Sequence, residues 1–120
     1  MQYAVPAAIN GDRSHQRVFR AALKERAVLT AESLRAMPGV TCVTPTAGFY
    51  AMPKVELPPG RTDEDFVLGL LRETGVLCVY GSGFGTPASA GYLRIVFLAS
   101  PDELKEVYRL MGDFTAKFRR

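Results

Sequence analysis

The chain has 120 residues, of which 48% are hydrophobic and 22% are charged. That size and composition are typical of one globular domain with its own core, and they exclude disordered and collagen-like chains. Fifteen Lys and Arg residues against twelve Asp and Glu give a net charge of +3, a surplus too small to indicate nucleic acid or an anionic membrane as a partner.

Residues 1–12 are largely apolar but too few to bury their own side chains, and the NGD sequence at 10–12 is typical of a turn. We expect the end of a helix whose packing partner lies upstream of Met1. A long helix is predicted over 14–37, because apolar residues recur along one face and Pro-Gly at 38–39 ends the pattern. The residues of that face are Phe19, Leu23, Ala27, Leu34 and Met37.

Two strands are predicted at 40–44 and 49–55, and the turn between them favours antiparallel pairing. A second helix is predicted to begin at Thr62 with a capping box to Asp65 and to end at Gly75. Its first turn is acidic, which the positive end of the helix dipole explains without a metal ion. These acidic residues are Asp63, Glu64 and Asp65.

The apolar run at 76–80 is typical of a strand covered on both faces. The glycine-rich segment at 81–87 could cradle a phosphate, but it lacks the ending of a P-loop and the spacing of a dinucleotide fingerprint, so a turn is favoured. A strand at 92–98 and a helix opened by a capping box at 100–103 follow. The order predicts a two-layer α+β fold, a small, mostly antiparallel sheet with helices packed on one face.

Arg94 interrupts the apolar strand at 92–98, where a guanidinium is costly to bury without an anion. Strand alternation places it opposite Leu93, Ile95 and Phe97, on a face so apolar that something should cover it. The guanidinium could receive a carboxylate in bidentate fashion or pair with a local Asp or Glu. Strand parity favours neither interpretation.

Phe49 and Tyr50 could form a stacking platform or strand core, and core is favoured. Cys42 and Cys78 lie in apolar stretches and are predicted to be buried reduced thiols. His15 is the only histidine, so this chain alone assembles neither a His/Cys zinc site nor a Ser-His-Asp or Cys-His pair. We expect no metal site.

No apolar run reaches the ~20 residues of a membrane span, and the N-terminus lacks the features of a secretory or transit peptide. Reduced cysteines also favour the cytosol. We therefore expect a cytoplasmic protein without a membrane or nucleic acid as partner.

Five segments follow one another along the chain: LRAMPGV at 34–40, PTAGFY at 45–50, ETGVLCVYGSGFG at 73–85, GYLRIVF at 91–97 and SPDEL at 100–104. Each is weak alone, but their order and separations resemble the C-terminal small domain of class I/II, fold type I, pyridoxal-phosphate-dependent aminotransferases over nearly the entire chain. One departure is Tyr80, which stands where many members have Pro.

The resemblance implies that residues 13–120 form the aminotransferase small domain and that 1–12 are a truncated interdomain segment. It implies that Arg94 binds the substrate α-carboxylate and that the side chain of Tyr50 borders the substrate. The complete enzyme would use pyridoxal phosphate to transfer an amino group between an α-amino acid and a 2-oxo acid. An upstream large domain would bind the cofactor, and the enzyme would be a homodimer.

The family's Schiff-base lysine has no counterpart among Lys24, Lys54, Lys105 and Lys117, and the other cofactor-binding groups have none either. We therefore expect no catalytic or cofactor-binding residue in this chain and no activity from the chain alone. The alternative is a stand-alone α+β binding or regulatory module without catalytic activity. An RNA-recognition domain is disfavoured because its strand motif is absent.

Overall fold

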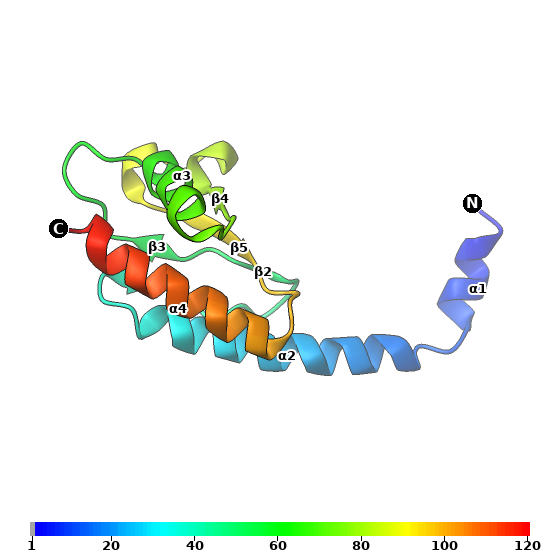
Figure 1. Ribbon diagram of the computed structural model, residues 1–120. Coiled ribbons are helices and arrows are strands. Elements are labelled where there is room, and N and C mark those ends of the chain that lie inside the picture. The colour runs from blue at the N-terminus through cyan, green and yellow to red at the C-terminus, as the bar shows by residue number, and fades with distance from the viewer. Residues whose placement is uncertain (1) are drawn as a thin grey trace.

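A computed structural model of the chain describes residues 2–120 (Figure 1). Its elements, in chain order, are α1 (Ala4–Asn10), α2 (Ser14–Arg35), β1 (Val40–Thr41), β2 (Tyr50–Ala51), β3 (Lys54–Val55), α3 (Asp63–Thr74), β4 (Val79–Tyr80), the 3-10 helices η1 (Gly81–Phe84) and η2 (Ala88–Ala90), β5 (Leu93–Val96) and α4 (Pro101–Phe118). Within residues 2–120, no helix combines the length and apolar character that a membrane crossing needs.

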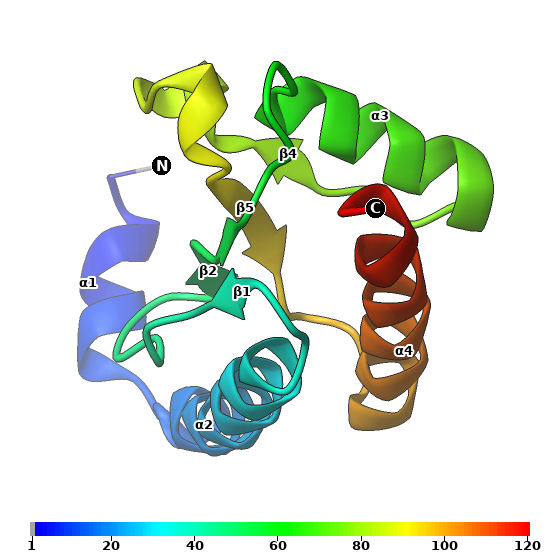
Figure 2. The same cartoon turned by 90° about the vertical axis from the view of Figure 1, so that its left-hand side faces the viewer.

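The strands and helices form two layers. β5 is the central strand of a three-stranded antiparallel sheet in the order β2-β5-β4, and β1 pairs with β3 in a two-stranded sheet. Helices α2, α3 and α4 lie on one side of these strands, with α4 in contact with both other helices (Figure 2). Leu34, Phe66, Leu70, Leu93 and Phe97 are fully buried between the layers. The predicted two-layer α+β fold is confirmed.

The segment predicted as one strand at 49–55 is two short strands with different partners. Tyr50 of β2 lies opposite Val96 of β5, whereas β3 pairs with β1. Pro53 separates the two strands and has no N–H to donate to a ladder. The predicted antiparallel pairing between 40–44 and 49–55 is therefore confirmed only at the ends of these segments, where β1 meets β3.

The apolar run at 76–80 becomes a strand only in its last two residues, β4. Leu77 is 73% exposed and Val79 is 37% exposed, while Cys78 is buried. The prediction of a strand covered on both faces is wrong, because β4 lies at the edge of the sheet and its outer face has no covering element within residues 2–120.

Both predicted capping boxes are present. In α3 the Thr62 hydroxyl accepts from the backbone N–H of Asp65, and Ser100 and Glu103 make the same arrangement at the start of α4. Gly75 ends α3 with φ +77°, a left-handed conformation that glycine adopts without strain. Local sequence signals therefore fix where the two packed helices begin and where α3 ends.

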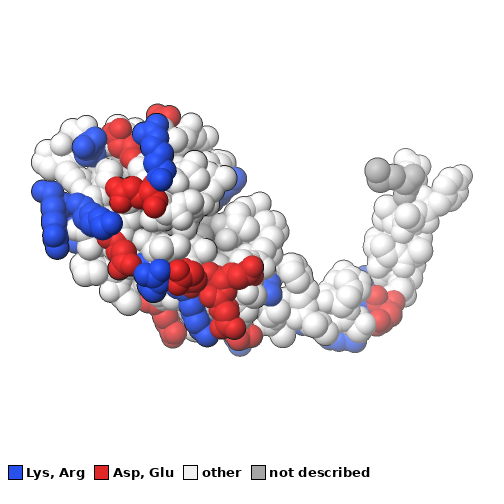
Figure 3. Space-filling view, viewed as in Figure 1, with Lys and Arg blue, Asp and Glu red and all other residues white. Residues whose placement is uncertain are grey.

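The N-terminal third of the chain is less buried than its pattern predicts. Phe19 is 49% exposed although it belongs to the predicted apolar face of the first long helix, because the N-terminal half of α2 projects beyond the sheet (Figure 1). From Ala27 onward the same face is buried. Helix α1 has no buried residue and carries no charge, whereas side chains of both charge signs gather on the visible face of the main body (Figure 3).

A buried hydrogen bond joins α2 to α4. The hydroxyls of Thr30 and Tyr108 lie 2.8 Å apart, and both residues are almost fully buried. Burial raises the pKa of Tyr108, and the hydrogen bond to Thr30 lowers it by less. The phenol therefore stays protonated as part of the core.

We expect Tyr108→Phe to lower the free energy of unfolding by about 1 kcal/mol, because it leaves the buried Thr30 hydroxyl without this partner. Chemical denaturation of the wild-type chain, Tyr108→Phe, Thr30→Val and the double variant measures the coupling. The double variant should lose about 1 kcal/mol less than the sum of the single losses. Strictly additive losses would show that the hydrogen bond contributes nothing to stability.

Candidate functional site

The side chains of β5 alternate between two environments, as strand parity predicts. Leu93, Ile95 and Phe97 are at most 7% exposed and pack against the helices. Arg94 and Val96 point to the opposite face, where Arg94 is half-buried and Val96 is exposed. The structure thus places the guanidinium on the side of the sheet that the three packed helices leave open.

The Arg94 guanidinium lies against two aromatic rings. Its Cζ is 3.9 Å from the centroid of the Phe84 ring and 4.9 Å from the centroid of the Tyr50 ring. Cation–π contacts of this kind contribute roughly 0.5–2 kcal/mol each, with the larger value where water is excluded. The two rings therefore hold the guanidinium beside the sheet by cation–π attraction.

Tyr50 reaches Arg94 from the neighbouring strand. It lies opposite Val96 in the β2–β5 register, and its ring is 4.4 Å from that of Phe49, measured between centroids. Tyr50 is 42% exposed, whereas Phe49 is half-buried and packs against the core. The favoured interpretation of both residues as strand core is therefore wrong for Tyr50, which forms an aromatic platform, and right for Phe49.

Phe84 is a site residue that the sequence reasoning missed. It ends η1, after which Gly85 turns the chain with φ +92°. The favoured turn interpretation of this glycine-rich segment is confirmed, since it forms the 3-10 helix η1 and the turn at Gly85, and η2 follows it before β5. The available signal was that Phe84 is the one aromatic residue of the segment at 81–87, where a turn has no need of a large apolar side chain.

Arg94 has no anionic partner in the part of the chain that the structure describes. Among residues 2–120 it forms no ion pair, and its buried Nε has no hydrogen-bond partner. The interpretation that a local Asp or Glu neutralises Arg94 is therefore wrong. An unpartnered buried donor costs roughly 1–3 kcal/mol.

The face that carries Arg94 is otherwise apolar and open. Its residues include Tyr50, Met52, Val79, Phe84, Val96 and Leu98, each between 37% and 49% exposed. No element among residues 2–120 covers them, so the expected cover does not come from the described chain. We call these six residues together with Arg94 the arginine face. Large contiguous apolar surfaces with a polar centre mark binding or interaction sites.

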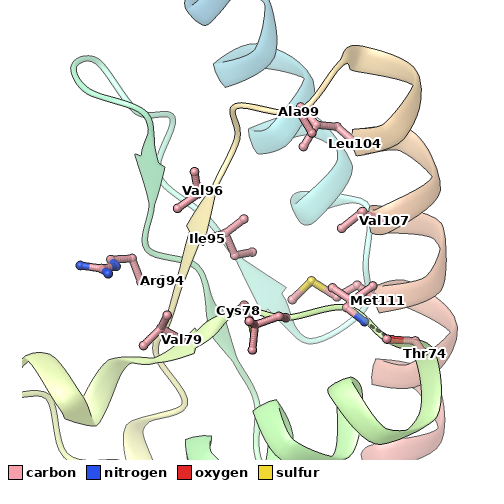
Figure 4. A pocket seen from close by; sticks show the side chains of 13 residues that line it. Thr74, Cys78, Val79, Arg94, Ile95, Val96, Ala99, Leu104, Val107 and Met111 are labelled. Carbon is pink, nitrogen blue, oxygen red and sulfur yellow. Dashed lines mark hydrogen bonds between the residues drawn. The ribbon is translucent and has the colours of Figure 1, made fainter.

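A cavity of about 450 Å³ lies on the other side of the sheet, between β4, β5 and α4. Figure 4 shows Cys78, Ile95 and Met111 pointing into it, while the Arg94 side chain points away. The cavity is thus an apolar space within the helix layer, separate from the arginine face. Both cysteines are free and buried, as predicted.

Asp63 does more than complement the dipole of α3, which is the role that the sequence predicts for it. Its carboxylate is fully buried and accepts two hydrogen bonds from Ser82 of η1. Asp65 alone forms the capping box with Thr62. The helix dipole therefore does not explain all three acidic residues, because Asp63 holds a segment 19 residues further along the chain.

The profile of the family described as Aminotransferase class I and II matches residues 1–109. The chain belongs to this family. Alanine aminotransferase 1 of Bos taurus is 31% identical over 118 residues, covering 90% of this chain and 24% of that protein. The glutamate-pyruvate aminotransferase of Haemophilus influenzae is 32% identical over 124 residues, covering 100% of this chain and 30% of that protein.

Solved structures agree with the family assignment. An alanine aminotransferase from Pyrococcus furiosus superposes with a TM-score of 0.88 at 34% identity, covering 97% of this chain and 29% of that one. An aromatic aminotransferase from Pyrococcus horikoshii superposes with a TM-score of 0.82 at 31% identity, covering 97% and 31%. The resemblance seen in the sequence motifs is confirmed, and the family depends on pyridoxal phosphate. This aminotransferase chain spans 24% to 30% of these two curated relatives.

The four lysines of this aminotransferase chain lie in four different surroundings. Among residues 2–120, none of them makes a cation–π contact with the rings of Tyr50 or Phe84. Lys54 lies over the Tyr92 ring, Lys105 pairs with Asp102, Lys117 pairs with Glu73, and Lys24 lines a groove beside α2. Lys54 thus lies beside Tyr92, which strand parity places on the same face as Arg94, and the contacts of the other three lysines lie elsewhere.

Burial raises the pKa of Cys78 from 9.0 to about 12. The unfolded chain therefore releases the thiol proton at lower pH than the folded chain does. The resulting stability is fully present below pH 9.0 and is lost as the pH rises toward about 12. The loss is about 1.4 kcal/mol per pH unit in that window.

We expect the stability difference between the wild-type chain and Cys78→Ala to shrink across this window at about that slope. Denaturation of both proteins at several pH values between about 8 and 11 checks it, and the difference cancels the titration of other groups. A difference that stays constant with pH would mean that the Cys78 thiol is not protected in the folded state.

Proposed function

We propose that this chain is the small domain of a pyridoxal-phosphate-dependent aminotransferase that transfers an amino group between an α-amino acid and a 2-oxo acid. In this proposal residues 13–120 are the domain, residues 1–12 belong to an interdomain segment, and Arg94 binds the substrate α-carboxylate. The observation that carries it is the Arg94 guanidinium on the open face of β5, held by two rings and without an anionic partner among residues 2–120.

The chemistry assigned to Arg94 is binding and orientation. A guanidinium presents parallel N–H donors that match the two oxygens of a carboxylate, and this fixes both the position and the plane of the bound group. Both the amino acid and the 2-oxo acid carry this carboxylate next to the reacting carbon. A single arginine can therefore hold both partners of the reaction in the same place.

Tyr50 supports the site from the side. Its ring contacts the Arg94 guanidinium and remains 42% exposed, so it borders the space that a carboxylate at Arg94 would occupy. We assign Tyr50 the role of a wall beside the substrate, which limits how the bound carboxylate can rotate. Its contribution follows from shape and from the cation–π contact rather than from proton transfer.

The apolar part of the arginine face suits an interface with another domain of the same enzyme. An upstream large domain that packs on this face would cover Val79 and Val96 and exclude water from the Arg94 guanidinium. Exclusion of water strengthens the attraction between guanidinium and carboxylate. The uncharged helix α1, which has no buried residue, would be buried in the same assembly, either by the large domain or by the second subunit of a homodimer.

Pyridoxal phosphate supplies the electron sink of amino-group transfer when it is bound to the enzyme. Because none of the four lysines matches the family's Schiff-base motif, we place the residues that hold the cofactor outside this chain. The chain by itself would bind carboxylates weakly and would not catalyse the transfer. The relatives carry names for different amino acids, including alanine and aspartate, and the α-carboxylate is the part that all such substrates share.

We expect Arg94→Lys in the complete enzyme to raise KM for both the amino acid and the 2-oxo acid. The increase should be about 10- to 100-fold, because a bidentate charge-assisted pair contributes roughly 1.5–3 kcal/mol and lysine keeps the charge without the fork. Steady-state kinetics with both substrates measures the effect.

Arg109→Lys is the matched control, since Arg109 lies on the outer surface of α4 in ion pairs with Glu106 and Asp113. This variant should leave KM unchanged. An unchanged KM in Arg94→Lys as well would remove Arg94 from the substrate site.

A further inference from the structure

A buried carboxylate holds the loop that carries Phe84. The Oδ2 atom of Asp63 accepts from the backbone N–H of Ser82 at 2.7 Å, and its Oδ1 accepts from the Ser82 hydroxyl at 3.0 Å. Asp63 is 0% exposed and forms no ion pair within residues 2–120. A buried charge is expensive unless hydrogen bonds compensate it. We call these two hydrogen bonds the Asp63–Ser82 clamp.

The clamp is one of two points at which η1 is attached. The other is Gly81, whose N–H donates to the carbonyl oxygen of Tyr92 at 2.7 Å. A Cβ at Gly81 would lie 2.6 Å from that oxygen, so the first residue of η1 is pressed against the start of β5. With Gly81 fixed on the sheet and Ser82 fixed on α3, the direction in which η1 continues is determined.

Phe84 follows Ser82 by two residues and depends on this direction. Its side chain is 49% exposed, and among residues 2–120 its ring makes no contact with another aromatic ring. The Arg94 guanidinium, at 3.9 Å from the ring centroid, is its close neighbour. Since core packing does not hold the ring, the backbone of η1 must aim it.

We propose that Asp63 is a positioning residue for the carboxylate site. It fixes η1 through Ser82, η1 aims the Phe84 ring, and the ring holds the plane of the Arg94 guanidinium. The role of Asp63 in substrate binding rests on the proposed function of Arg94. The series of contacts from Asp63 through Ser82 and Phe84 to Arg94 does not depend on that function. Loss of the clamp should let the guanidinium leave the orientation in which it binds a carboxylate. Asp63 itself lies away from the reacting atoms, so the chemical step should not change.

The series of contacts from Asp63 to Arg94 is tested by NMR on the complete enzyme labelled with ¹⁵N at arginine. The Nε–H proton of Arg94, assigned by its absence in Arg94→Lys, lies near the face of the Phe84 ring and is shifted upfield by the ring current. Phe84→Leu defines the position of this signal without the ring. We expect Asp63→Ala to move the signal most of the way toward that position.

Two variants separate the clamp from other effects. Asp63→Asn should keep the signal near its wild-type position, because a carboxamide can accept from the Ser82 N–H and donate to the Ser82 hydroxyl. Asp65→Ala removes the capping carboxylate of the same helix turn and should also leave the signal in place. If Asp63→Ala does not fold, Ser82→Ala removes one of the two bonds and should move the signal in the same direction by less.

The consequence for substrate binding is tested by kinetics. Asp63→Ala should raise KM for the amino acid about 3- to 10-fold while kcat changes by less than about 2-fold, because it disturbs orientation and not chemistry. Asp63→Ala combined with Phe84→Leu should be no worse than Phe84→Leu alone, since residues that act through one another are not additive.

The outcomes distinguish the two proposals. An Arg94 signal that stays in place in Asp63→Ala, or that moves as far in Asp63→Asn as in Asp63→Ala, overturns the clamp. Full additivity with Phe84→Leu overturns it as well. If the Arg94 signal moves as expected in Asp63→Ala while KM is unchanged in Arg94→Lys, the positioning role of Asp63 is supported and the proposed function is contradicted.

Discussion

A guanidinium in the middle of an apolar sheet face is the constraint on which this domain depends. Arg94 sits on the central strand, where β2 and β4 hold both backbone edges. Its register is fixed by Val79 opposite Arg94 and by Ala51 opposite Ile95. A slip by one residue would turn Arg94 into the core and Ile95 out of it. The burial of β5 against the helices therefore also determines where the positive charge points.

The two faces of the sheet have different physical roles. On the helix side, apolar residues from three helices enclose the buried side chains of β5 and line an apolar cavity. On the other side, aromatic and aliphatic residues surround a single charge and stay between 37% and 49% exposed. Burial on the helix side stabilises the fold. The opposite side remains open to a ligand and to another domain that could cover it. This division explains how a domain of ordinary composition can carry a large open apolar surface.

Much of the fold could be predicted because its signals are local. The capping boxes at Thr62 and Ser100, the left-handed Gly75 and the alternation along β5 all lie within a few residues of the feature they determine. Arg94 could be placed on the open face by parity alone. Tyr50 could be assigned a place beside the substrate only through the family resemblance.

The rest could not be predicted because it depends on contacts distant in sequence. The exposure of Leu77 follows from the edge position of β4, which no periodicity reveals. The clamp joins Asp63 to a residue 19 positions away, so its acidic side chain looked like ordinary helix-start chemistry. Pro53 marks the break between β2 and β3, but the aromatic and β-favouring residues around it predict one continuous strand over 49–55.

The most direct test of the account is a crystal structure of the complete enzyme with a bound 2-oxo acid. The account predicts that the carboxylate lies in the plane of the Arg94 guanidinium, with its two oxygens at roughly 2.7–2.9 Å from two nitrogens, and that the Phe84 ring remains on the face of that guanidinium. A carboxylate bound elsewhere, with Arg94 paired to an acidic side chain from outside this chain, would contradict it.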